Sequence, residues 1–148
     1  MIRTATIDDL PAIKQCVDAA YEIYVERLGG KPKPMLADYE TQVRDGIVSV
    51  AVDDHGDVQG YIICYARLGT MLLENVAVSP HHQGRGVGKR LIAFCDEEAR
   101  RQGCQAIELF THVKLTENRA LYARLGYETI DRPEDKQLDR VCFRKRLA

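Results

Sequence analysis

Residues 73–90 read LENVAVSPHHQGRGVGKR. A β-rich run leads into a loop with glycine at alternate positions, and this loop opens an amphipathic helix. Glycine lets the backbone approach a ligand closely, and the first amides of a helix have no internal acceptor. The helix dipole adds partial positive charge there, and Arg85, Lys89 and Arg90 add full charges. The segment therefore predicts an anion site that is best suited to phosphate.

The spacing of the glycines excludes the two common nucleotide loops. A P-loop needs a glycine where Gln83 stands and a Ser or Thr where Arg90 stands. The dinucleotide pattern GxGxxG would place its third glycine on Lys89. The pattern that fits is Q-x-x-G-x-G, from Gln83 to Gly88.

This pattern resembles the pyrophosphate loop of the GNAT family of N-acetyltransferases, which present it to coenzyme A. Two neighbouring segments strengthen the resemblance. Residues 74–78, ENVAV, look like the family's central strand, and residues 118–127, NRALYARLGY, look like its second signature. The resemblance covers most of the chain and is strongest from residue 73 to 127.

The resemblance implies a sheet that splays between two parallel strands, with the pantetheine arm of acetyl-CoA lying in the gap. The arm bonds to strand main chain much as an added β-strand would. The pyrophosphate rests on the loop amides, and an asparagine bonds the arm near its thiol end. The implied cofactor contacts are Val76, Ala77, Val78, Gln83, Gly84, Arg85, Gly86, Val87, Gly88, Lys89, Asn118 and Tyr122.

Two side chains are candidates for catalysis. Tyr122 matches the family tyrosine near the thioester sulfur, where a phenol that is protonated at neutral pH can donate to a departing thiolate. The alternative for Tyr122 is a core aromatic on a short helix. Glu74 interrupts an apolar strand and is a candidate base for the acceptor amine, directly or through a water. Its alternatives are a carboxylate facing solvent or a partner for an arginine.

The resemblance also implies a primary amine, of a small molecule or a peptide, as the acceptor in an acyl transfer without a covalent enzyme intermediate. In this fold the acceptor pocket is built largely from the first helices and late loops, which here include residues 29–36 and 132–139. Candidate acceptor contacts are Tyr24, Tyr39, Thr111 and His112. A protein N-terminus, a lysine side chain, a polyamine and an aminoglycoside all fit as acceptors.

Composition limits the other function classes. The chain has 21 basic and 22 acidic side chains, and this balance argues against a nucleic-acid-binding module. No apolar run approaches a membrane span, and no signal stretch opens the chain, so we expect a cytoplasmic protein. The five cysteines show no metal or disulfide spacing. We expect a small bacterial-type enzyme without a metal, able to pair as a homodimer; a non-catalytic acetyl-CoA sensor is the alternative.

Hydrophobic periodicity predicts the elements around the loop. Expected helices cover residues 10–28, 35–44, 86–101 and 117–125. Expected strands cover residues 2–6, 47–52, 58–65, 71–78, 106–110, 127–130 and 140–146. The order β-α-α-β-β-β-α-β-α-β-β predicts an α/β fold with a mixed sheet and helices on its faces. A chain of 148 residues is expected to form one domain, residues 1–148.

Overall fold

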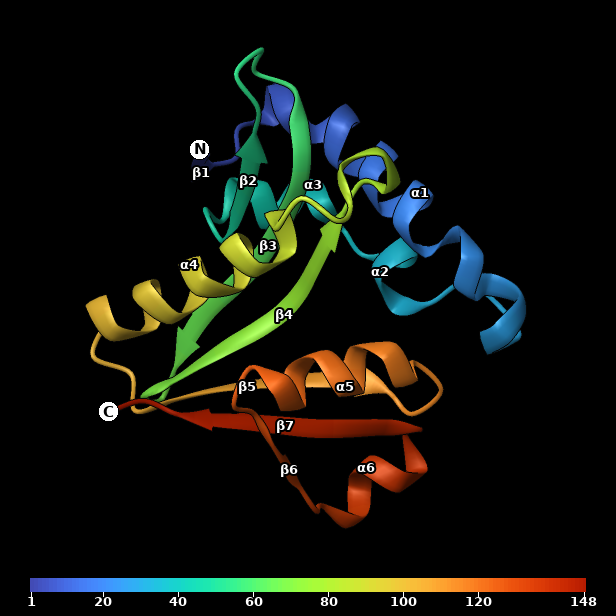
Figure 1. Ribbon diagram of the computed structural model, residues 1–148, viewed down its shortest axis with the longest axis vertical. Helices are drawn as coiled ribbons and strands as arrows, with labels where there is room; N and C mark the ends of the chain where they lie inside the picture. The colour runs from blue at the N-terminus through green and yellow to red at the C-terminus, as the bar shows by residue number, and fades with distance from the viewer. The chain divides into compact units, whose positions relative to one another are not determined.

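The computed structural model describes residues 1–148 and has a mixed α/β fold (Figure 1). One seven-stranded sheet has the strand order β1-β2-β3-β4-β5-β7-β6, which confirms the predicted fold class. The strands are β1 Ile2–Thr4, β2 Val48–Val52, β3 Val58–Arg67, β4 Thr70–Val78, β5 Ala106–His112, β6 Glu128–Ile130 and β7 Arg140–Arg146. The helices are α1 Leu10–Leu28, α2 Lys33–Leu36, α3 Tyr39–Arg44, α4 Val87–Arg101, α5 Thr116–Arg124 and α6 Pro133–Gln137.

The chain divides into two compact units. The first contains Met1–Cys64 and Asn75–Cys95, and the second contains Tyr65–Glu74 and Asp96–Ala148. The expectation that residues 1–148 form one domain stays a prediction. No helix combines the length and the apolar character that crossing a membrane requires.

The first unit is built around the buried strands β2 and β3. All five residues of β2 are buried, as expected for a strand that is covered on both faces. The apolar stripe of α1 contributes Ile13 and Val17 to the same core as Val50 on β2 and Ile63 on β3. Helical spacing of apolar residues thus places α1 against the sheet, as the periodicity predicts.

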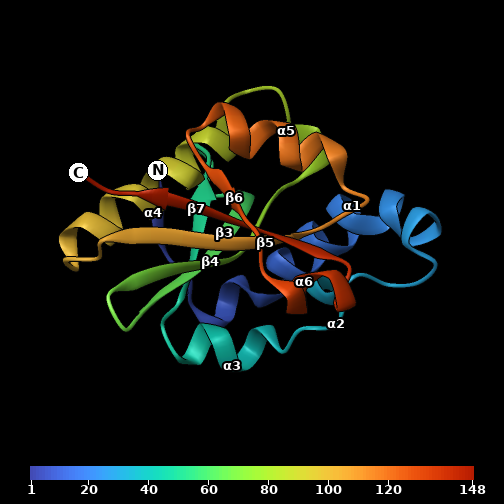
Figure 2. The same cartoon turned by 90° about the horizontal axis from the view of Figure 1, so that it is seen from below.

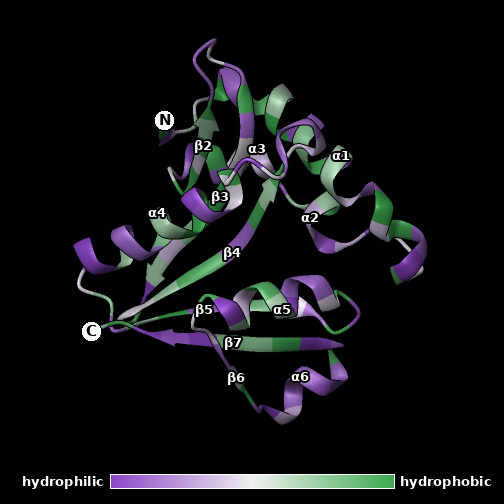
Figure 3. Ribbon diagram, in the orientation of Figure 1, coloured by the Kyte–Doolittle hydropathy of each residue, from purple (hydrophilic) through white to green (hydrophobic).

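The second unit is built around the long ladder between β5 and β7. These strands are antiparallel, with register from Ala106↔Arg146 to His112↔Arg140, and β6 pairs with the middle of β7. The middle of β7 is apolar and both of its ends are hydrophilic (Figure 3). The helices α5 and α6 lie on opposite faces of this part of the sheet (Figure 2). The beginning of β4 joins β5 as a parallel strand through Thr70–Leu72.

One local expectation was wrong, and one short helix was not expected. A single helix over residues 35–44 is instead two short helices, α2 and α3, because Asp38 starts a new helix. Its carboxylate accepts hydrogen bonds from the Thr41 amide at 3.1 Å and from the Thr41 hydroxyl at 2.8 Å, which is the chemistry of an N-cap. The helix α6 was not expected, although Pro133 at its first turn is a typical helix start.

The close approach of β3 to β4 gives a test of the fold. A Cβ on Gly60 would lie 2.6 Å from the carbonyl oxygen of Ala77, so the backbone must shift to accept any side chain. We expect Gly60→Ala to lower the free energy of unfolding by about 1–3 kcal/mol, measured by urea denaturation. Gly30→Ala is the matched control, because a Cβ there has nothing within 4 Å. Equal stability of the two variants would contradict this packing.

Candidate active site

The loop between β4 and α4 leaves a row of backbone donors without acceptors. Gly84 and Gly86 adopt left-handed φ angles of 80° and 79°, which side chains rarely tolerate. The first amide that finds a helical acceptor is that of Arg90, which donates to the Gly86 carbonyl at 3.0 Å. The six amides of residues 84–89 therefore have no acceptor in the protein. Six such donors beside a helix N-terminus form a place where an anion is stabilised.

Side chains hold this loop in shape. The Gln83 amide donates from Nε2 to the carbonyl oxygen of Val78 at 3.2 Å, and Arg90 donates from Nη1 to the carbonyl oxygen of Arg85 at 3.2 Å. Gly88 faces β4, where an added Cβ would meet Val78 Cγ2 at 3.6 Å. The loop is thus fixed to the end of β4 on one side and to the first turn of α4 on the other.

The end of β4 directs part of its main chain away from β3. The Ser79 amide donates to the Gln59 carbonyl on the β3 strand at 2.9 Å. Alternate residues of an antiparallel strand direct their amide and carbonyl to the same side. Ala77 therefore points its main chain toward β3, while Val76 and Val78 point theirs toward the opposite edge. This edge is the one that an extended ligand can pair with.

The buried side-chain amide of Asn75 forms hydrogen bonds with three tyrosines beside this edge. The Asn75 oxygen Oδ1 accepts hydrogen bonds from the hydroxyls of Tyr21 at 3.0 Å and Tyr61 at 3.2 Å. Its Nδ2 donates to the Tyr39 hydroxyl at 2.8 Å, and that hydroxyl donates to the Pro34 carbonyl. Asn75 is 7% exposed. One side chain therefore ties β4 to α1, β3, α3 and the turn at α2.

The environment of Tyr61 keeps its phenol protonated. Burial raises the pKa of Tyr61 above its ordinary value, and the neighbouring Tyr21 and Tyr39 raise it further. The Tyr61 phenol therefore keeps its proton and can donate. The Tyr21 hydroxyl also lies 3.4 Å from the carbonyl oxygen of Val76, on the outward edge of β4. The expected acceptor contact Tyr39 is thus a core residue, 3% exposed, whose hydroxyl is bonded within the protein.

The other expected acceptor contact on this unit lies on α1. Tyr24 is partly buried, its ring centroid lies 6.2 Å from that of Tyr21, and the guanidinium of Arg27 lies 5.1 Å from its centroid. The aromatic pair on α1 thus continues from the buried cluster toward the surface.

The candidate base Glu74 is exposed on β4. It is the exposed residue of a strand that otherwise alternates between buried and partly buried positions. Burial raises the pKa of the Tyr65 phenol, and the neighbouring Glu74 carboxylate raises it further. Tyr65 is therefore a partner of Glu74. The sequence did not indicate this contact, because the two residues lie on different strands and only the pairing of β3 with β4 brings them together.

The remaining candidates lie in the second unit around β5 and α5. Tyr122 is 7% exposed and packs edge-on against Tyr127, with ring centroids 5.7 Å apart. Asn118 lies one turn earlier on the same helix. Thr111 is buried, and the next residue, His112, accepts a hydrogen bond at Nδ1 from the Lys114 amide at 3.1 Å. The neutral His112 ring therefore carries its proton on Nε2.

The predicted site residues thus fall into two sets. Residues 76–78 and 83–89 belong to the first unit, together with Tyr24 and Tyr39. Glu74, Thr111, His112, Asn118 and Tyr122 belong to the second. No group of three or more His, Cys, Asp or Glu side chains is close enough to hold a metal ion.

Comparison with known proteins decides the family. Residues 13–127 match the model of the acetyltransferase (GNAT) family. The chain belongs to this family. The match spans the unpaired amides of residues 84–89 and the segment around Tyr122. Family membership therefore confirms the resemblance that the loop indicates. It also identifies the chain as an acyltransferase.

Individual relatives of this GNAT protein show how far the likeness extends. Aminoalkylphosphonate N-acetyltransferase of Salmonella typhimurium is 34% identical over 56 residues, which are 38% of this chain and 36% of that protein. The uncharacterized N-acetyltransferase YjgM of Escherichia coli is 28% identical over 139 residues, covering 88% of this chain and 83% of that protein. The crystal structure of PaiA N-acetyltransferase from Thermoplasma acidophilum, in complex with coenzyme A, has the same fold, with a TM-score of 0.78 at 14% identity over 99% and 98% of the two chains.

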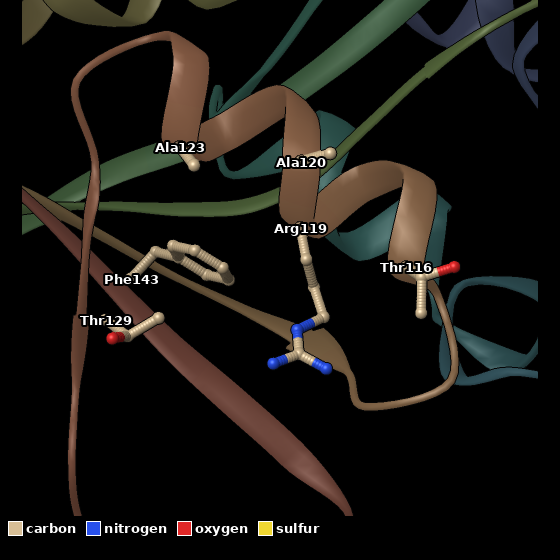
Figure 4. Close-up of a pocket in the computed structure, with 6 residues that line it drawn as sticks. All are labelled: Thr116, Arg119, Ala120, Ala123, Thr129 and Phe143. Atoms are coloured by element: carbon tan, nitrogen blue, oxygen red, sulfur yellow. The ribbon is translucent and has the colours of Figure 1, made fainter.

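This GNAT protein also has an open hollow between α5 and the strands β6 and β7. It has a volume of about 360 Å³ and contains none of the predicted site residues. The side chains around it come from α5, β6 and β7 (Figure 4). They are Thr116, Arg119, Ala120, Ala123, Thr129 and Phe143.

The buried amide at Asn75 gives a test of the tyrosine cluster. In Asn75→Asp the Tyr39 hydroxyl loses its donor, and a carboxylate is desolvated, so its pKa rises above the unfolded value of about 3.9. The folded variant then binds its proton more tightly than the unfolded chain does. Stability is therefore retained at low pH and lost as pH rises through the raised pKa. We expect a loss of roughly 2–4 kcal/mol relative to the parent at pH 8 and a smaller loss at pH 5.

Urea denaturation at both pH values measures this difference. Asn118→Asp, on the first turn of α5, is the matched control and should stay near the parent. A loss for Asn75→Asp that is the same at pH 5 and pH 8 would contradict the raised pKa that burial of this side chain predicts.

Proposed function

We propose that this chain binds acetyl-CoA at the amides of residues 84–89 and transfers the acetyl group directly to the primary amine of a small molecule or peptide. The observation that supports this most strongly is the row of six unpaired amides between left-handed glycines and the first turn of α4. Bound acetyl-CoA supplies a thioester, whose carbonyl carbon is open to attack by an amine.

The loop fits a diphosphate in both shape and charge. A diphosphate presents several oxygens that accept hydrogen bonds, and a run of backbone amides in this conformation is the arrangement that receives them. The side chains of Arg85 and Lys89 are exposed beside the amides and add positive charge. The outward edge of β4 at Val76 and Val78 is continuous with the loop and suits an extended amide-containing arm.

An acceptor amine must lose a proton before it can attack. An amine with a pKa of about 10.4 is neutral in only roughly one molecule in 2,500 at pH 7. Glu74 is the proposed base, because it is an exposed carboxylate on the strand that continues into the cofactor edge. The phenol of Tyr65 beside it orients the carboxylate, while Glu74 receives the amine proton directly or through a water.

The proposed role of Tyr122 is to donate its phenol proton to the leaving thiolate. Its ring is fixed by packing against Tyr127 and against Phe143, whose centroid lies 5.8 Å away. A fixed donor needs no reorganisation when charge develops on sulfur. The names of the relatives support the same reaction class, since PaiA is an N-acetyltransferase crystallised with coenzyme A and the Salmonella protein acetylates aminoalkylphosphonates.

A panel of amines with acetyl-CoA, assayed for release of the CoA thiol, tests the proposed function. We expect thiol release with at least one primary amine. In Gly86→Val the left-handed φ of 79° is disfavoured, so the loop amides rearrange, and acetyl-CoA affinity measured by calorimetry should fall by at least about 10-fold. Gly46→Val is the matched control, because Gly46 has a similar φ of 76° in the turn before β2.

The outcomes separate the proposal from its rivals. Equal acetyl-CoA affinity in the Gly86→Val and parent proteins would contradict the loop assignment. Tight binding of acetyl-CoA without thiol release from any amine would identify a sensor instead of an enzyme.

The role of Glu74 predicts a change in the pH profile. Glu74→Gln removes the base, so we expect turnover to fall by about 10²-fold or more and the rise of rate with pH to flatten. Glu128→Gln, an exposed carboxylate on β6, is the matched control. A turnover and pH profile equal to those of the parent would exclude Glu74 as the base.

A further inference from the structure

Two arginines flank an exposed aromatic ring on the face of the sheet that carries α6. Phe110 on β5 is 38% exposed, although it is a large apolar side chain. The guanidinium carbon of Arg140 lies 4.1 Å from the ring centroid, and that of Arg132 lies 6.0 Å from it. Their charge centres are therefore separated by no more than about 10 Å, about one Debye length, and their potentials add.

One buried and one partly buried carboxylate hold the two arginines in place. Arg140 donates from Nε to Asp135 Oδ1 at 2.8 Å, and Arg132 donates from Nη2 to Glu108 Oε1 at 3.0 Å. The side chains of Asp135 and Glu108 are only 5% and 13% exposed. Each guanidinium is thus oriented by a carboxylate behind it, and the aromatic ring fixes its plane.

The outward nitrogens of these arginines have no acceptor. Arg140 makes its one hydrogen bond through Nε, which leaves both Nη groups unpaired. Arg132 uses only Nη2. The two side chains are 28% and 32% exposed, so the unpaired donors are accessible. A guanidinium held at Nε with its terminal nitrogens open is arranged for bidentate contact with a carboxylate or phosphonate.

A third guanidinium lies beside these two ion pairs. Arg144 lies 3.7 Å from the Glu108 carboxylate, so three guanidiniums face two carboxylates. The buried thiol of Cys142 lies among them: burial raises its pKa, Arg132 and Arg140 lower it, and Glu108 and Asp135 raise it. The three guanidiniums and two carboxylates therefore form one compact group.

We propose that Arg132 and Arg140 bind an anionic group, a carboxylate or a phosphonate, at the far end of the acceptor amine. The proposal rests on the proposed function and narrows its acceptor to a small amine with an acid group. The ring of Phe110 contacts the short alkyl chain between the two ends.

The position on β5 suits this role. Arg140 is paired with His112 in the ladder between β7 and β5, at the carboxyl end of β5. His112 is one of the predicted acceptor contacts, so Arg140 lies directly across the ladder from it. Phe110 and His112 share one face of β5, while Tyr122 packs on Phe143 on the opposite face. The acid group of the acceptor and Tyr122, the proposed donor to sulfur, therefore lie on opposite faces of the pair formed by β5 and β7.

A purely structural role would have different consequences. The same ion pairs could serve only to fasten α6 to β7, and removing an arginine would then affect all acceptors alike. A binding role affects only acceptors that carry the acid group.

The test compares matched acceptors in the thiol-release assay. β-Alanine and 2-aminoethylphosphonate carry the acid group, and β-alaninamide and diethyl 2-aminoethylphosphonate are their neutral counterparts. We expect the parent to have a higher kcat/KM for each acid-bearing acceptor than for its neutral counterpart. Arg140→Gln should lower kcat/KM for the acid-bearing acceptors by about 10- to 100-fold. For the neutral counterparts, kcat/KM of this variant should stay within about twofold of the parent's value. The two acids separate carboxylate from phosphonate recognition. Arg146→Gln, at the other end of β7, is the matched control.

A second variant and a binding measurement keep the test decisive. Arg132→Gln leaves the Arg140–Asp135 pair intact and should give the same selective loss if Arg140→Gln fails to fold. If no amine releases thiol, the proposed function fails, and calorimetry with 2-aminoethylphosphonate and with β-alanine then tests the anion site alone. Three results would overturn the proposal. The parent could show equal kcat/KM for acid-bearing and neutral acceptors, or the variants could lose kcat/KM equally for both. In the calorimetry, the substitutions could leave the binding of both acids unchanged.

Discussion

The structure depends on one constraint: a helix cannot satisfy its first amides by itself. At α4 the unpaired amides also include those of the preceding loop, because left-handed Gly84 and Gly86 direct further amides away from any acceptor. The loop is held open by contacts from Gln83 to β4 and from Arg90 to the loop carbonyl. An anion that fills this row satisfies donors that would otherwise be left to water. The proposed cofactor chemistry rests on this feature.

A second constraint acts in the core of the first unit. A buried amide must find partners for its oxygen and its nitrogen, and Asn75 finds them in three phenols. Because hydrogen bonds in a core have directions, the cluster fixes the orientation of Tyr39 and, through it, the Pro34 turn. The strand that carries the cofactor edge is therefore rigidly connected to the helices that follow the N-terminus.

The sequence predicted what depends on local spacing. Glycine positions identified the loop, and the amphipathic helix expected after it has a fully buried face, formed by Val87, Leu91, Cys95 and Ala99. What depends on distant partners could not be predicted: Tyr21 and Asn75 are 54 residues apart, and only the folded sheet brings them together. The same is true of Arg132 and Glu108, separated by 24 residues. The break before α3 is different, because it depends on a local residue: Asp38 is a typical N-cap type and starts a new helix inside the expected helix 35–44.

The cysteines have a consequence for the chemical durability of the protein. All five are free thiols, and four of them, Cys16, Cys95, Cys104 and Cys142, are buried. Burial raises the pKa of Cys16 to about 11, so its reactive thiolate is about one part in 10⁴ at pH 7. Electrophiles and peroxide should therefore act first on Cys64, which is partly buried on β3. A single thiol-reactive dye would then label the native protein at one known position without any engineering.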